Sequence, residues 1–291
     1  MAFSVRYRPG GRRSGSYPAS RTFFSALERN TLPTLARVDF VTAQRPRAFV
    51  GVAGPDAADY LQRMLSNDVE ALAPGESCDA LLLTAKARVI APLLVLRRGA
   101  DDFLLLTEPE LGERVRAELT RMRFAAKAEI EPEEHTSTLV FDARPEGGIA
   151  NADYAREAWE VLDAELDGEL LAEEQLERLR IEAGTPRYGR EIDDRVLPAE
   201  TGLTERAVSF TKGCYPGQEP IARQHYRGKV NRRLRVLEVE GVVAPETEVL
   251  LGGKSVGRVT SSVPGLALAY VRVEVPDDAE LAVDGARARL H

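Results

Sequence analysis

The hydrophobic pattern of this chain changes character near Gly228. Before that residue, apolar side chains recur at helical spacing in some segments and at strand spacing in others. After it, only short strand-like runs remain, separated by glycine and proline. A chain of 291 residues is also too long for one ordinary core. We therefore predict an α+β domain over residues 47–228 and a small β-barrel domain, or a sandwich, over residues 229–291.

Helices and strands are expected to interleave in the first domain. Asp56 can cap a helix whose apolar stripe begins at Ala57. Thr107 and Glu110 read as a capping box before a second helix. A third helix over residues 171–183 ends at Gly184. Strands are predicted at residues 48–52, 80–84, 89–97, 103–106, 128–131, 138–141 and 158–162, and in the second domain at residues 234–239, 248–251, 255–260, 267–274 and 281–283.

The N-terminal segment has an unusual composition. Its first 27 residues contain five arginines and no acidic residue. We interpret residues 1–46 as a disordered tail, which fits a cytoplasmic protein. The alternative is a transit peptide, which has a similar composition and would direct the chain to mitochondria.

Composition excludes several classes of protein. No apolar run approaches the roughly 20 residues needed to span a membrane. The formal net charge of −7 argues against a protein that coats nucleic acid. The two cysteines, Cys78 and Cys214, form no CxxC pair, and the chain has only three histidines. We therefore predict no metal site built by this chain alone and a reducing compartment.

One stretch of the chain is locally basic. Six cations and no carboxylate lie between Arg223 and Arg235. This strip either attracts an anion or forms a solvated strand face, and the sequence leaves both readings open.

The segment from Phe210 to Glu219 carries the strongest chemical signal. Pro216-Gly217 favours a tight turn, so Cys214 is expected on a loop. The ammonium of Lys212, two residues away, favours the thiolate over the thiol. An inert cysteine is the alternative reading, and Cys78, just before a predicted strand, is interpreted as structural.

Lys212–Glu219 resembles the K-G-C-Y-x-G-Q-E signature of the YgfZ family, which is related to the glycine-cleavage T-protein. Arg180–Gly184 resembles the R-x-E-A-G segment that both groups share. Asn67-Asp68 and the G-x-V-T-S stretch at residues 257–261 extend the likeness, which covers roughly residues 47 to 275.

This resemblance implies an aminomethyltransferase-like, folate-binding α+β domain around a central channel, followed by a β-barrel. It implies tetrahydrofolate, or a one-carbon derivative, as ligand. Glu182 would accept hydrogen bonds from the pterin. Tyr215, Gln218 and Glu219 are further expected folate contacts. Arg223 is assigned to the anionic tail from its charge alone.

The chain departs from the T-protein where that enzyme has a G-G-I-x-D-D stretch. Ala91 and Pro92 stand in place of the two aspartates, so we expect folate binding without glycine cleavage, and the sequence leaves open whether the chain is an enzyme. The family usually has glycine at the position of Ala87.

The resemblance implies an accessory protein for assembly or repair of iron–sulfur clusters in client enzymes, including tRNA-modifying ones. Cys214 and Lys212 are the expected active pair. The thiol would hold a cluster transiently with a partner, or exchange an adduct with folate. A one-carbon transferase with an unknown acceptor is the first alternative. A tRNA-binding helper is weaker, because Tyr226 is the only aromatic residue near the basic strip. No membrane partner is expected, and direct nucleic-acid binding is not favoured.

Overall fold

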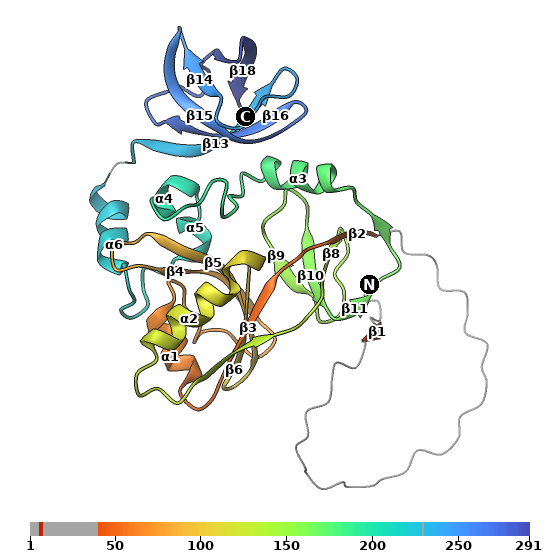
Figure 1. Cartoon of the computed structure of the whole chain (residues 1–291), viewed down its shortest axis with the longest axis vertical. Helices are drawn as coiled ribbons and strands as arrows, with labels where there is room; N and C mark the ends of the chain where they lie inside the picture. The colour runs from red at the N-terminus through yellow and green to blue at the C-terminus, as the bar shows by residue number, and fades with distance from the viewer. Residues whose placement is uncertain (1–5, 8–39, 229) are drawn as a thin grey trace, which may run out of the picture.

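The computed structural model of the chain describes residues 6–7, 40–228 and 230–291 (Figure 1). Most of the predicted disordered tail, residues 1–46, lies outside the described residues. Its last part does not match that expectation, because strand β2 (Val41–Gln44) is paired in a sheet and buries Thr42 and Ala43. The ordered fold therefore begins before Arg47.

The first sheet has five antiparallel strands in the order β4-β5-β6-β3-β7. One of its faces packs against α1 and α2 around Val52, Leu61, Phe103 and Val115. Helix α1 follows Asp56, but the Asp56 side chain does not cap it as predicted, because its carboxylate accepts a hydrogen bond from the Lys127 N–H at 2.7 Å. The elements are β3 (Ala48–Ala53), α1 (Ala57–Met64), β4 (Ser77–Leu83), β5 (Val89–Gly99), β6 (Asp102–Thr107), η1 (Pro109–Leu111), α2 (Gly112–Met122) and β7 (Glu129–Glu133).

The second sheet has the order β12-β2-β8-β10-β9. Phe49 and Leu94 of the first sheet pack against Ile149 of the second, so the two sheets share an apolar layer. Helix α3 packs near Leu139 on this sheet through Leu176 and Leu179. The elements are β8 (Ser137–Phe141), β9 (Ile149–Asn151), β10 (Ala158–Leu162), β12 (Glu169–Leu170) and α3 (Glu173–Glu182), and a separate pair joins β1 (Arg6–Tyr7) to β11 (Ala164–Glu165).

Three short helices connect α3 to the C-terminal domain (Figure 1). They are α4 (Pro198–Thr201), α5 (Thr204–Ala207) and α6 (Gln218–Arg227). Helix α6 was not predicted, and it corrects the reading of residues 223–235 as one strand face. The segment bends into a helix because Gly217 adopts a left-handed conformation and starts a new element. Ile221 is its buried anchor.

The C-terminal domain is a closed barrel in the order β13-β16-β15-β14-β17-β18, which confirms the predicted α+β fold with a terminal barrel. Its interior is filled by alternate apolar residues such as Leu237, Val259 and Ala269. Strand β18 was not predicted. The strands are β13 (Arg232–Val239), β14 (Glu248–Leu251), β15 (Lys254–Val263), β16 (Leu266–Arg272), β17 (Leu281–Val283) and β18 (Ala286–Leu290).

A buried carboxylate joins the barrel to the first domain. Glu191 accepts a hydrogen bond from the Oγ of Ser261 at 2.6 Å, and its other oxygen lies 3.1 Å from the guanidinium of Arg180. The hydroxyl of Tyr270 donates to the Glu191 carbonyl at 2.7 Å. Arg180, the arginine of the R-x-E-A-G segment, therefore has a structural role, because it pairs with the carboxylate that holds the barrel. No helix in the described part of the chain is long and apolar enough to cross a membrane.

Candidate functional site

Cys214 lies exposed on the loop between α5 and α6. The predicted position of this thiol on a loop therefore agrees with the structure. Cys78 differs from it in exposure. It is partly buried in β4, and burial raises the pKa of its thiol to about 12. A thiol with that pKa stays protonated and unreactive at neutral pH.

Lys212 anchors the cysteine loop to the end of α1. Its Nζ lies 2.5 Å from the carbonyl oxygen of Gln62 and 2.7 Å from those of Leu65 and Asn67. An ammonium has three N–H donors, so these carbonyls use all of them. Burial lowers the pKa of Lys212 to about 8. The structure therefore gives Lys212 an anchoring role, where the sequence suggested that it activates Cys214.

The turn after Cys214 packs closely on the β4–β5 turn. Gly217 has φ of +84°, and a Cβ at this position would lie 2.7 Å from the carbonyl oxygen of Thr84 and 3.0 Å from the Cα of Ala87. Ala87 itself has φ of +57°, a left-handed conformation that favours glycine. Tyr215 is buried beneath the loop, and burial raises the pKa of its hydroxyl to about 12.

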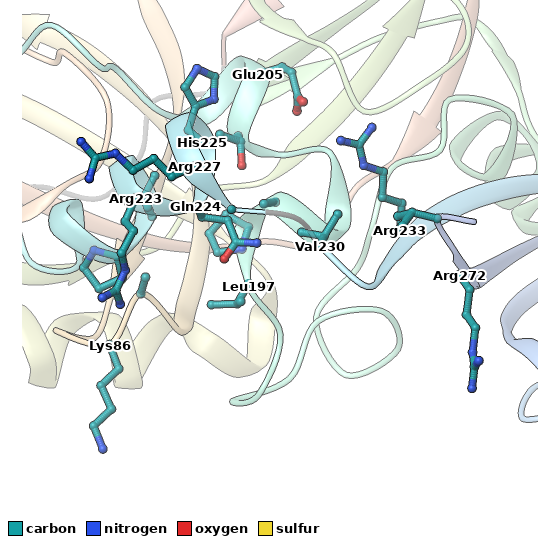
Figure 2. A pocket seen from close by; sticks show the side chains of 18 of the residues that line it. Lys86, Leu197, Glu205, Arg223, Gln224, His225, Arg227, Val230, Arg233 and Arg272 are labelled. Carbon is teal, nitrogen blue, oxygen red and sulfur yellow. The ribbon is translucent and has the colours of Figure 1, made fainter. Parts of the chain in front are cut away.

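A cavity of about 800 Å³ opens between α6 and the barrel (Figure 2). We call it the α6–barrel cavity. Arg223 and Arg227 come from α6, Arg233 from β13, and Lys86 from the turn between β4 and β5. In Figure 2, Arg233 lies on one side of the cavity and Arg223 and Lys86 on the other. The basic strip of the sequence is thus divided between two elements that face a common space.

These four cations differ from their neighbours in having no carboxylate partner among the described residues. Arg235, by contrast, lies 2.8 Å from Asp277. Glu205 is the carboxylate among the residues that line the cavity. Thr204 also belongs to the lining, but its hydroxyl is buried, with no hydrogen-bond partner among the described residues. The unpaired charges suit a ligand with anionic oxygens.

An aromatic cluster borders the same cavity. The rings of Phe210 and His225 stack with centroids 4.1 Å apart, and Tyr226 meets His225 edge-on at 4.9 Å. Tyr226 is 69% exposed. The sequence pointed only to Tyr226, because the helical turn that brings Phe210 against His225 was not predicted.

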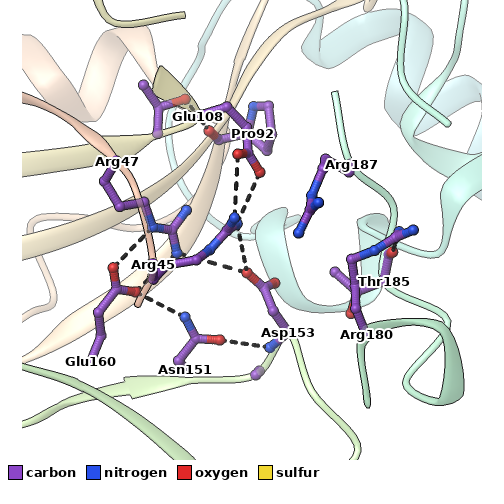
Figure 3. A network of polar contacts seen from close by, with 12 residues as sticks. Arg45, Arg47, Pro92, Glu108, Asn151, Asp153, Glu160, Arg180, Thr185 and Arg187 are labelled. Atoms are coloured by element: carbon purple, nitrogen blue, oxygen red, sulfur yellow. Dashed lines mark hydrogen bonds and ion pairs between the residues drawn. The ribbon is translucent and has the colours of Figure 1, made fainter. Parts of the chain in front are cut away.

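The junction of the two sheets contains a network of buried ion pairs (Figure 3). Arg47 makes two hydrogen bonds of 2.9 Å to Glu160, whose side chain is fully buried. Arg45 lies 2.9 Å from Glu108, and both arginines lie within 4 Å of Asp153. The remaining space is only about 40 Å³. We call this the central cavity.

Pro92 lines the central cavity, and Ala91 is fully buried in β5. The Pro92 carbonyl accepts a hydrogen bond from the Oγ of Thr107 at 2.9 Å. Thr107 is therefore the last residue of β6 and not the capping residue that we predicted. Asp79 also lines this cavity, and burial raises the pKa of its carboxyl to about 6.

Glu182 is the last residue of α3 and lies 2.9 Å from the Nε of Arg178. It lines a third cavity of about 1210 Å³, between α3 and the barrel, which we call the α3–barrel cavity. The structure thus separates the expected folate contacts. Arg223 lines the α6–barrel cavity, and Tyr215, Gln218 and Glu219 line neither of the two large cavities. In the described part of the chain, no three His, Cys, Asp or Glu side chains gather as a metal site.

Comparison with known proteins gives consistent matches. A family model described as the C-terminal β-barrel domain of CAF17 matches residues 231–291. The mouse mitochondrial iron–sulfur cluster assembly factor IBA57 is 26% identical over 78% of this chain and 76% of its own length. The tRNA-modifying protein YgfZ of Photorhabdus laumondii is 29% identical over 74% of each chain. The crystal structure of the glycine cleavage system aminomethyltransferase T from Bartonella henselae superposes with a TM-score of 0.74. The match covers 88% of this chain and 86% of that enzyme's chain, at 18% sequence identity, and it supports the fold.

Proposed function

Because this chain belongs to the YgfZ/IBA57/CAF17 family, which is related to the aminomethyltransferases, we propose that it is an accessory protein for iron–sulfur cluster assembly or repair. The exposed thiol of Cys214 on an anchored loop is the observation that carries the proposal. Client iron–sulfur proteins, tRNA-modifying enzymes among them, are its proposed partners. The proposed location is the cytoplasm, where thiols stay reduced.

Cys214 acts in this proposal as a ligand for a cluster that is cargo and not a resident cofactor. A thiolate is the form that binds iron, and a partner supplies the other ligands. The loop suits this task because Lys212 fixes its start and Gly217 fixes its end, while the thiol itself remains in solvent. A fixed position reduces the ordering cost when a partner docks.

Tetrahydrofolate is the ligand that we propose, and the fit differs between cavities. The central cavity is far smaller than the roughly 300–1,000 Å³ of ordinary ligand sites, and ion pairs fill it. The α3–barrel cavity is large enough, and Glu182 presents a carboxylate to it. One Glu182 oxygen is paired with Arg178, so the other would accept a hydrogen bond from the pterin. A bound folate would supply a carrier for one-carbon units.

The thiol proposal is tested in cells that lack the endogenous gene. Cys214→Ser is expected to leave cluster occupancy of client enzymes at the level of the empty vector, measured from iron and sulfide content. Cys78→Ser is the matched control and is expected to restore occupancy, because this thiol stays protonated. Full restoration by Cys214→Ser, with normal protein levels, would contradict the proposal.

The folate proposal is tested by anaerobic calorimetry with tetrahydrofolate. Saturable binding is expected for the wild type and at least a tenfold loss for Glu182→Gln, because the single acceptor oxygen of a glutamine cannot serve both Arg178 and the pterin. Glu174→Gln is the control, since Glu174 lies exposed on the same helix. Absence of binding by folded wild type would remove folate from the function and leave the cysteine loop.

A further inference from the structure

We propose that the α6–barrel cavity and the adjoining aromatic cluster bind a segment of single-stranded nucleic acid. The phosphates would lie along the cations of the cavity, and a base would stack on the exposed ring of Tyr226. This site requires neither Cys214 nor a folate, so the inference goes beyond the accessory function.

The charge distribution is the first argument. The whole chain has a formal net charge of −7, yet one cavity is lined by four cations from three separate segments, namely Lys86, Arg223, Arg227 and Arg233. Nearby arginines are neutralised by carboxylates, as Arg232 is by Glu200 at 3.2 Å, but these four have no such partner in the described part of the chain. Unpaired cations around one cavity favour a ligand with several negative charges.

The aromatic cluster indicates which class of anionic ligand fits the site. His225 lines the cavity and stacks on Phe210, so the rings continue directly from the cationic surface. Tyr226 follows His225 in sequence and presents an exposed ring. An acidic peptide would use this ring only through an additional apolar side chain, whereas every unpaired base has a face that stacks on an aromatic side chain. A duplex keeps its bases stacked internally and so cannot use the cluster. Single-stranded nucleic acid is the class that uses both features.

Fluorescence anisotropy with a labelled eight-nucleotide RNA of mixed sequence tests the proposal. Single-stranded binding loses affinity with a log–log salt slope of about −0.7 for each neutralised phosphate, so four cations predict a slope of about −3. Arg223→Gln combined with Arg227→Gln is expected to weaken binding and to bring the slope to about −1.4. Tyr226→Ala is expected to weaken binding roughly 5- to 150-fold without changing the slope, because it removes stacking alone.

Arg258→Gln is the charge control, since this exposed arginine pairs with Glu246 on the barrel and does not line the cavity. It should bind like the wild type. The proposal is overturned by no binding at 50 mM salt, by equal affinity for the matching duplex, or by a Tyr226→Ala variant that binds as tightly as wild type. If inorganic polyphosphate competes as well as RNA, the site recognises charge alone and the stacking assignment fails. Cys214→Ser should bind RNA normally, which separates this test from that of the thiol.

Discussion

The Nζ of Lys212 lies 2.7 Å from the carbonyl oxygen of Leu65, the C-cap residue of α1. This bond joins the cysteine loop to a helix almost 150 positions earlier in the sequence, and two further carbonyls accept from the same ammonium. The carbonyls at a helix C-terminus have no partner within the helix. Lys212 therefore stabilises the helix end and the loop together.

Replacement of Lys212 by methionine is predicted to reduce stability and loop order. Hydrogen bonds to a charged donor contribute roughly 1.5–3 kcal/mol, so we expect a loss of about 2 kcal/mol in the free energy of unfolding. Urea denaturation measures this loss. Limited proteolysis should show faster cleavage near Cys214. A variant with unchanged stability and an intact loop would show that the three bonds are dispensable.

Replacement of Glu160 by glutamine is predicted to be the more severe change. The glutamine leaves Arg47 buried without its main partner, and breaking a buried pair in this way costs about 3–5 kcal/mol. Denaturant unfolding should therefore begin at a much lower concentration. Glu113→Gln is the control, because its pair with Arg116 lies at the surface, and it should unfold like the wild type.

Periodicity and turn residues were sufficient to predict most of the barrel strands and the exposure of Cys214. They did not predict α6, because Gln218–Arg227 is polar and has only Ile221 as a buried anchor. The contacts of Lys212 with the end of α1 were not predicted either, since its partners are backbone carbonyls that no sequence pattern marks. The ion pairs of the central cavity join residues as far apart as Arg47 and Glu160, and only the folded chain brings them together.

Asp79 gives a prediction about pH. Burial raises the pKa of its carboxyl to about 6, so the folded state holds this proton more tightly than the unfolded chain does. Ionisation of Asp79 therefore lowers stability as the pH rises from 4 through 6. Asp79→Asn removes this cost and should raise the free energy of unfolding by about 1–2 kcal/mol at pH 8, with little effect at pH 4.

Denaturation of both proteins across this pH range provides the measurement. Arg206 keeps Asp153 at 2.7 Å in the variant, so the substitution leaves no unpaired buried cation. A variant that is less stable than the wild type at pH 8 would show that the pair of Asp79 with Arg206 outweighs the cost of burial.

Gly213 and Gly217, which lie on opposite sides of Cys214 in the sequence, allow a matched test of loop geometry. A methyl group at Gly217 would meet the Thr84 carbonyl oxygen at 2.7 Å, and the φ of +84° is unfavourable for alanine. A methyl group at Gly213 would meet nothing within 4 Å. Gly217→Ala is therefore predicted to cost about 2 kcal/mol and to displace the loop from the β4–β5 turn, whereas Gly213→Ala should be close to neutral.

The occupancy of iron–sulfur clusters in client proteins should rank the two variants in the same order as their stability. Gly217→Ala is expected to reduce it severalfold, because Cys214 is no longer held in position for a partner, and Gly213→Ala should retain it. Alkylation with iodoacetamide measures the thiol directly: Cys214 should react in both variants, since exposure is not what changes. If Gly217→Ala supports full occupancy despite lower stability, an exposed thiol alone is sufficient and the anchored geometry of the loop has no part in the function.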